Sequence, residues 1–149
     1  MAEFQSSNYV KSVAKPQIPI EMGEVSGKPR FLYNEYQPLA NLAAADTILL
    51  GKIPAGARVI GGWIKSAAQG GSCTADIGNQ ISAQSGAEAA DVDSLGAAFS
   101  LVAAGALLLN SKNGAKFGNK FTEEVLIFAT INATGSTGLI QIAIEYVLD

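Results

Sequence analysis

The sequence predicts an all-β, mostly antiparallel fold: a jelly-roll-like β-sandwich with one short helix and an extended N-terminal arm. Three observations support this prediction. Short runs rich in β-branched and aromatic residues recur at nearly regular spacing, turns containing Gly and Pro separate them, and the last run alternates between its two faces. We count about seven or eight such runs, a number typical of an antiparallel sandwich or jelly roll.

The chain of 149 residues is long enough for one domain, and its first part differs from the rest. Residues 1–30 hold three of the five prolines, Pro16, Pro19 and Pro29, and show no sustained strand or helix period. Proline forces extended backbone and removes an N–H donor. We therefore interpret residues 1–30 as an extended N-terminal arm and residues 31–149 as the β-sandwich domain.

The arm carries more apolar side chains than a purely solvating tail needs. We expect these side chains to enter grooves of a neighbouring subunit or of a larger shell, which makes them candidate partner-binding residues. They are Phe4, Tyr9, Val10, Ile18, Ile20 and Met22. A disordered tail and a first edge strand are the alternative interpretations.

Four strands are predicted in the first half of the domain. They cover residues 31–37, 47–53, 58–66 and 72–78. Pro38 ends the first strand, and Pro54-Ala55-Gly56 forms a turn after the second, because Pro presets φ and Gly tolerates positive φ. The pair Gly61-Gly62 inside the third strand predicts a β-bulge or a close approach of backbones.

The middle of the chain predicts a loop, a helix and a strand. Residues 81–90 are rich in Gln, Ser, Ala and Gly and are expected to form an exposed loop. Asp91 is expected to cap a short helix. Four apolar residues follow on one side of that helix at spacings of three and four: Val92, Leu95, Phe99 and Val102. Residues 106–109 then predict a buried strand.

The C-terminal segment has the clearest pattern. Residues 123–132 are apolar on both faces, as expected of a strand covered on two sides. After a turn rich in Gly, Thr and Ser, residues 139–149 alternate, so that one face is committed to the core. That face holds Ile140, Ile142, Ile144, Tyr146 and Leu148. We expect the two segments to pair as one long hairpin.

The low content of charge predicts association. Charged residues make up 15% of the chain and hydrophobic residues 48%, whereas a typical soluble domain has about 25% charged residues. We therefore expect part of the surface to be buried against copies of the chain or against a partner. Trp63, Tyr33 and Tyr36 are candidate oligomer-interface residues, because aromatic side chains are enriched where binding energy concentrates. A monomer with an Ala/Gly-rich surface, and a core position for Trp63, are the alternatives.

The sequence lacks the residues or the spacings that several kinds of catalytic and metal site require. Cys73 is the one cysteine and histidine is absent, which excludes an intrachain disulfide, a Cys/His zinc site and a histidine-based triad. The carboxylate pair Asp91 and Asp93 suits a helix start. A calcium site formed by these two and Asp76 matches no EF-hand spacing. We expect no enzymatic activity, no cofactor and no metal.

Nucleic acid and membranes are also unexpected as partners. The net charge is −3, and Lys and Arg form no clustered basic patch. Residues 94–111 are free of charge, but Gly96 and Gly105 interrupt them and they barely reach the length of a membrane span. Residues 1–7 lack the basic and apolar regions of a secretory signal. Synthesis in a reducing cytoplasm is compatible with the lone thiol.

Three segments occur in a recognisable order. Ala-Asp-Thr-Ile-x-Leu-Gly-Lys-Ile-Pro-Ala-Gly-Ala-Arg-Val at residues 45–59 precedes Thr-Ala-Asp-Ile-Gly at 74–78 and Ala-Asp-Val-Asp-Ser-Leu-Gly-Ala-Ala at 90–98, and a closing pair of strands follows. Over roughly residues 31–149 this order resembles small structural proteins of tailed-phage virions, above all the decoration or cement proteins of the outer capsid. The resemblance implies a non-enzymatic homotrimer, made in the host cytoplasm, that binds the major capsid protein at the capsid surface of the virion.

A recognition module is the alternative function. Such a module, in a head fibre or tail tip, would bind carbohydrate or a host surface and would need a flat platform of exposed aromatic side chains. Trp63, Tyr33, Tyr36 and Tyr146 are the candidates, and Tyr146 is already assigned to the core face.

Overall fold

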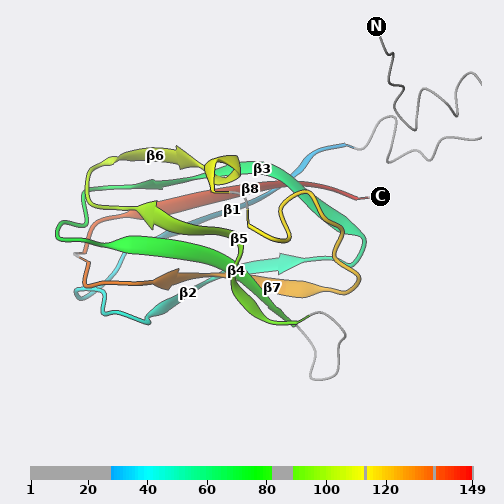
Figure 1. The fold of residues 1–149 in the computed structure, drawn as a ribbon. Coiled ribbons are helices and arrows are strands. Elements are labelled where there is room, and N and C mark those ends of the chain that lie inside the picture. The colour runs from blue at the N-terminus through cyan, green and yellow to red at the C-terminus, as the bar shows by residue number, and fades with distance from the viewer. Residues whose placement is uncertain (1–27, 82–88, 113, 136, 149) are drawn as a thin grey trace, which may run out of the picture.

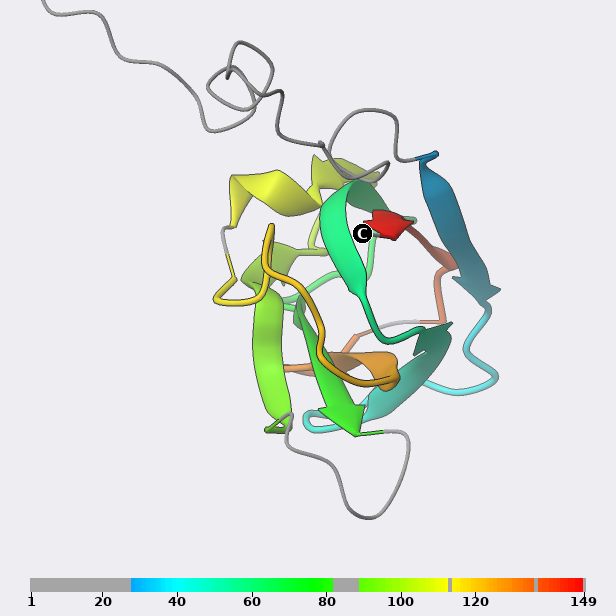
Figure 2. The same cartoon turned by 90° about the vertical axis from the view of Figure 1, so that its right-hand side faces the viewer.

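The computed structural model of this chain describes residues 28–81, 89–112, 114–135 and 137–148. Within these residues eight strands form two four-stranded antiparallel sheets that pack face to face (Figure 1). The end-on view of Figure 2 shows one sheet above the other. The described residues contain no helix with the length and apolar character needed to cross a membrane.

The two sheets are here called sheet A and sheet B. Sheet A has the strand order β1-β8-β3-β6 and sheet B the order β2-β7-β4-β5. The strands of sheet A are β1 (Arg30–Tyr36), β8 (Ile140–Leu148), β3 (Ala57–Ser66) and β6 (Gly105–Leu108). Those of sheet B are β2 (Thr47–Ile53), β7 (Val125–Ile131), β4 (Thr74–Ile81) and β5 (Asp91–Ser100).

The connectivity is that of a jelly roll. The chain passes from one sheet to the other at every connection except β4–β5, whose two strands pair with each other. Eight strands wound in this way into two sheets are the jelly-roll arrangement. The predicted fold class is therefore confirmed, and the predicted strand over residues 47–53 has the bounds of β2.

The core lies between the sheets and comes from alternate strand positions. On β8, Ile140, Ile142 and Ile144 are buried, while Tyr146 and Leu148 are partly buried against the same core, as the alternation predicted. From sheet B, Ile127 and Ile131 of β7 lie in the same cluster. Full burial of such a side chain stabilises the fold by about 1.5–3 kcal/mol.

The bulge predicted at Gly61-Gly62 is present in β3. The pairing of β3 with β8 shifts register between Val59 and Gly61, and the extra residue, Ile60, is exposed. Gly62 has φ +135°, and a Cβ atom at this position would overlap the carbonyl oxygen of Ala143 and lie 2.7 Å from Leu109 Cδ1. A glycine is therefore required where β3 passes β8.

The helix predicted from Asp91 is wrong, because residues Asp91–Ser100 form strand β5. Leu95 and Phe99, four apart, are both buried, and a spacing of four places two residues on one face of a strand as well as of a helix. The spacing of three suggested the helix, yet Val92 and Val102 at those positions are exposed. Within the described residues the helical structure is the 3-10 turn η1 (Leu109–Ser111).

Two further expectations about strands are wrong. The strand expected to be buried at residues 106–109 is instead β6, which is mostly exposed and ends at Leu108, before the buried Leu109. The long hairpin of residues 123–132 with residues 139–149 does not form, because β7 pairs with β2 and β4 while β8 pairs with β1 and β3. Both strands are apolar enough to occupy an interior position in a sheet. Their apolar patterns do not specify which strand pairs with them.

Parts of the predicted organisation lie outside the described residues. The first 27 residues of the predicted arm are among them, with all six of its candidate partner-binding residues, as are residues 82–88 of the predicted loop. Strand β1 begins at Arg30, next to the predicted boundary between arm and domain.

Candidate interaction surface

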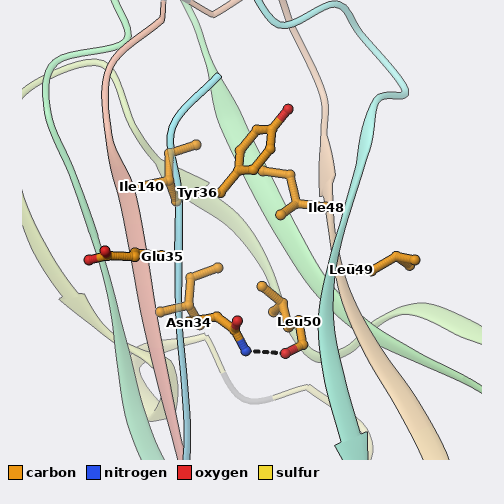
Figure 3. Close-up of a pocket in the computed structure, with 8 residues that line it drawn as sticks. Asn34, Glu35, Tyr36, Ile48, Leu49, Leu50 and Ile140 are labelled. Atoms are coloured by element: carbon orange, nitrogen blue, oxygen red, sulfur yellow. Dashed lines mark hydrogen bonds between the residues drawn. The ribbon is translucent and has the colours of Figure 1, made fainter. Parts of the chain in front are cut away.

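A small pocket lies between the edge strands β1 and β2, and Figure 3 shows its lining. Its volume is about 50 Å³. Ligand sites usually occupy about 300–1,000 Å³, so this pocket has room for a water molecule or two and not for a substrate.

The pocket is a structural corner of the sandwich. Asn34 of β1 donates a hydrogen bond from Nδ2 to the carbonyl oxygen of Leu50 on β2, which ties the edges of the two sheets together (Figure 3). Tyr36 lines the same pocket beside Ile48 and Ile140. Tyr36 therefore does not share a face with Tyr33, because residues three apart on a strand point to opposite faces.

The outward face of sheet A carries a row of apolar side chains. The strand register aligns Tyr33 of β1, Ala143 of β8, Trp63 of β3 and Leu108 of β6 across all four strands. The rings of Tyr33 and Trp63 meet above the small Ala143, with centroids 6.2 Å apart and an interplanar angle of 60°. This geometry is within the range that favours aromatic pairs.

Phe31 extends the apolar surface along β1. Phe31 is 66% exposed, Leu108 60% and Tyr33 50%. We call Phe31, Tyr33, Trp63 and Leu108 the aromatic row. Single exposed apolar residues are common on proteins, but a contiguous group that spans a whole sheet is typical of an interaction surface.

Polar side chains border the aromatic row on one side. Gln141 donates from Nε2 to the hydroxyl oxygen of Tyr33 (3.0 Å), and that hydroxyl donates to Glu35 Oε2 (3.3 Å). Gln141 also pairs in register with Lys65. These contacts hold the Tyr33 ring in place while its face stays accessible.

A glutamate borders the row on the other side. Glu145 lies opposite Phe31 on β1 and Gly61 on β3. A Cβ atom at Gly61 would lie 2.9 Å from Glu145 Oε2, so the glycine leaves space for the glutamate side chain. An apolar centre with a charged and polar rim is the usual arrangement of a protein interface.

The structure brings together two of the three predicted interface residues. Tyr33 and Trp63 are in contact, whereas Tyr36 lies at the corner pocket. Sequence reasoning missed Phe31 and Leu108. A strand over residues 31–37 places Phe31 and Tyr33 on the same face, so this period could have identified Phe31. Leu108 carried no such signal, because its strand was expected to be buried.

The carboxylates Asp76, Asp91 and Asp93 lie near one another on β4 and β5. The pKa of Asp93 is raised above its ordinary value. The largest cause is the side-chain hydrogen bond with Asp91, the next is the negative charge of Asp91, and the charge of Asp76 adds a smaller effect. Asp76 Oδ1 accepts a hydrogen bond from the backbone N–H of Ala98 (2.7 Å), which supports β5 where Ala98 has φ +53°. In the ranges that the structure describes, no group of three Asp, Glu, Cys or His side chains is placed to hold a metal ion.

Cys73 is fully buried in the core cluster. Burial raises the pKa of its thiol, because desolvation disfavours the thiolate. The side chain therefore acts as a small apolar group of the core.

Chains in solved structures have a fold similar to that of this protein over most or all of its length. No protein-family model matches the sequence, and no curated protein sequence is significantly similar to it. A chain in the capsid asymmetric unit of cyanophage Pam1 has a similar structure, with a TM-score of 0.65 and 16% identity over 100% of both chains. A chain in the capsid of Ralstonia phage GP4 is also similar, with a TM-score of 0.61 and 14% identity over 88% of this chain and 90% of that one.

Proposed function

We propose that this protein is a non-enzymatic structural component of a phage virion, which binds the outside of the capsid as an oligomer and stabilises the shell. The observation that carries the proposal is the similarity of the fold, over 88–100% of this chain, to chains found in two phage capsids. The low content of charged residues and the exposed aromatic row agree with a protein that works by contact with other chains.

The aromatic row is the proposed oligomer interface. Trp63 and Tyr33 form its centre, and aromatic side chains at the centre of an interface commonly supply most of its binding energy. Because the row lies on the outward face of sheet A, we expect its matching surface to belong to another chain. The resemblance to decoration proteins favours a trimer.

The N-terminal arm, residues 1–30, is the proposed second contact. Its candidate residues Phe4, Tyr9, Val10, Ile18, Ile20 and Met22 would bind grooves of a neighbouring subunit or of the shell. An oligomer that carries several arms gains avidity from multivalent attachment, so each single contact can be weak.

Stabilisation of the shell follows from linkage. A protein that bridges neighbouring copies of the major capsid protein binds the assembled shell and not its dissociated subunits. Such binding lowers the free energy of the assembled state by an amount that grows with the concentration of the bridging protein.

Two measurements test the proposal together. Light scattering of the purified protein at micromolar concentration should give the mass of an oligomer, with a trimer expected. Assembled capsids of the cognate phage should carry the protein to the pellet in a centrifugal binding assay and should then resist a higher temperature. A monomer that ignores assembled capsids would contradict the proposal.

Carbohydrate recognition is the second candidate, because Tyr33 and Trp63 expose aromatic rings on one face. The angle of 60° between the rings departs from the flat platform that a sugar ring stacks on. Trp63 is the single tryptophan, so its fluorescence reports directly on this surface. A saturable change on addition of host polysaccharide would favour recognition over shell binding.

A further inference from the structure

Strand β6 is a short edge strand that lacks charged residues and proline. It is the last strand of sheet A and, in the described part of the chain, pairs with β3 only. Residues 101–111, which contain β6, include no charged residue and no proline. Natural proteins commonly blunt an exposed edge with charge, proline, a covering segment or a very short strand, because unpaired N–H and C=O groups can pair with another strand. Of these devices β6 has the short length but neither charge nor proline.

The opposite edge of the same sheet is different. Strand β1 carries Arg30 and Glu35, and the hydrogen bond from Asn34 to the carbonyl oxygen of Leu50 holds it against β2. The two edges of sheet A therefore differ in their capacity to accept another strand, and β6 is the accessible one.

A surface recess lies along β6. Its volume is about 230 Å³. It is lined by small or apolar residues, namely Ser100, Ala103, Ala104, Gly105, Ala106 and Leu107. A recess of this size beside a strand can take an apolar side chain. Added strands are recognised in this way: backbone hydrogen bonds give affinity, and pockets for alternate side chains give specificity.

We propose that the β6 edge accepts an extended segment by strand addition, and that this segment is residues 8–14 of a second copy of the chain. The inference deepens the proposed function and rests on it, because it assigns a binding site on the body to the N-terminal arm. It also connects the arm to the aromatic row, since Leu108 belongs to both β6 and that row.

The sequence of the arm identifies the segment. Residues 8–14, Asn-Tyr-Val-Lys-Ser-Val-Ala, contain no Gly or Pro and include Tyr9, Val10 and Val13, residue types that favour strands. Pro16 and Pro19 follow and cannot donate to a ladder of hydrogen bonds. The apolar Tyr9, Val10 and Val13 provide a side chain for the recess whichever face of the added strand points into it.

The arm is long enough to reach a second copy of the chain. Residues 15–29 contain Pro16, Pro19 and Pro29, which hold backbone extended, and a fully extended segment of this length spans about 50 Å. Within one molecule, β6 lies three strand spacings from β1, or about 14 Å. Residues 15–29 are therefore long enough to carry residues 8–14 to β6 of a neighbouring copy, and the two tagged copies in the first test distinguish that pairing from pairing within one chain.

The first test is a disulfide between two copies. One full-length copy carries Val10→Cys, a differently tagged copy carries Ala106→Cys, and the two are produced together and oxidised with diamide. We expect a disulfide between the two tagged chains, identified by mass spectrometry. Cys73 is fully buried, and burial raises the pKa of its thiol, so it should not compete.

The matched control places the second cysteine on a distant exposed turn. Ala55→Cys, in the turn between β2 and β3, should give at most a tenth of the cross-linked product of Ala106→Cys. Equal yields from the two positions would overturn the assignment to β6.

The second test measures amide hydrogen exchange in the full-length protein at those N–H groups of β6 (Gly105–Leu108) that point away from β3, which belong to alternate residues. Val10→Pro should raise the exchange rate of these amides at least tenfold, because proline disrupts the added strand. Val25→Pro makes the same substitution outside residues 8–14 and should leave the rates unchanged. Rates that are the same in wild type and both variants would contradict strand addition.

The outcomes separate this inference from the proposed function. If neither test succeeds but the protein is oligomeric and sediments with capsids, strand addition at β6 is wrong and the structural role stands. If the protein is monomeric and ignores capsids, both proposals are wrong.

Discussion

At the scale of single residues, small side chains make the candidate surface possible. Ala143 separates Tyr33 from Trp63 in the strand register, and its single methyl group lets the two rings meet above it. Gly61 leaves space for the Glu145 side chain at the border of the row. Larger residues at these two positions would push apart the groups that give the surface its shape.

Gly62→Ala should destabilise the fold strongly. The position has φ +135°, and a methyl group would overlap the backbone of β8, so we expect a loss of about 2 kcal/mol or more in the free energy of unfolding. Urea denaturation measures this loss. Gly105→Ala is the matched control, because a Cβ atom there meets nothing within 4 Å, and its effect should stay within about 0.5 kcal/mol.

Asp93→Asn should stabilise the protein at neutral pH. The pKa of Asp93 is raised in the folded state, so the folded protein holds this proton more tightly than the unfolded chain does. The ionised carboxylate therefore reduces stability above its folded-state pKa, and this cost is lost as the pH falls from that value to the lower pKa of the unfolded chain. Melting temperatures at pH 7 and pH 3 should show a gain for the variant at pH 7 only. A gain of the same size at both values would contradict a raised pKa of Asp93 in the folded state.

At the scale of elements, β5 shows why a spacing of four is ambiguous. Leu95 and Phe99 lie on one face in a strand as they would in a helix. The strand also departs from regular pairing: its register with β4 shifts twice, and Gly96 and Ala98 have positive φ. Irregular pairing hides the period of two that otherwise identifies a strand.

Strand β8 is one of the two central strands of sheet A and pairs with β1 on one side and β3 on the other. Ile144→Ala on this strand should reduce the free energy of unfolding by about 2–5 kcal/mol, because the side chain is fully buried and a cavity would remain. Ile60→Ala provides the same substitution at the exposed bulge of β3 and should cost less than about 1 kcal/mol. Thermal or urea unfolding of both variants checks the difference.

At the scale of the whole molecule, the sandwich has two outward faces that differ in character. The face of sheet A carries the aromatic row, whereas on sheet B the exposed Leu49 lies beside the nearly buried Phe128. A molecule that exposes an aromatic row across one sheet is suited to an assembly in which another chain covers that row.

Trp63→Ala should therefore weaken association while leaving the fold intact. We expect a loss of at least about 2 kcal/mol in association free energy, or about 30-fold in affinity, if the aromatic row is the oligomer interface. Analytical ultracentrifugation measures this change, with circular dichroism to confirm folding. Leu49→Ala removes a side chain that is 63% exposed on the other face and should leave association unchanged. Equal effects of the two variants would locate the interface elsewhere.

The sequence by itself determined the class of the fold and the places where most strands lie. Alternating apolar residues and Gly or Pro turns are local signals, and a strand such as β2 or β8 displays them without reference to the rest of the chain. The burial of Ile140, Ile142 and Ile144 followed from the same alternation.

Only the tertiary structure decided which strands pair and which side chains meet. Strands β7 and β8 are consecutive in the chain yet lie in different sheets, because pairing depends on the shape of the whole sandwich. The aromatic row is assembled from β1, β3 and β6, and its members, from Phe31 to Leu108, are far apart in sequence. Long-range register, which no local pattern encodes, brings them onto one face.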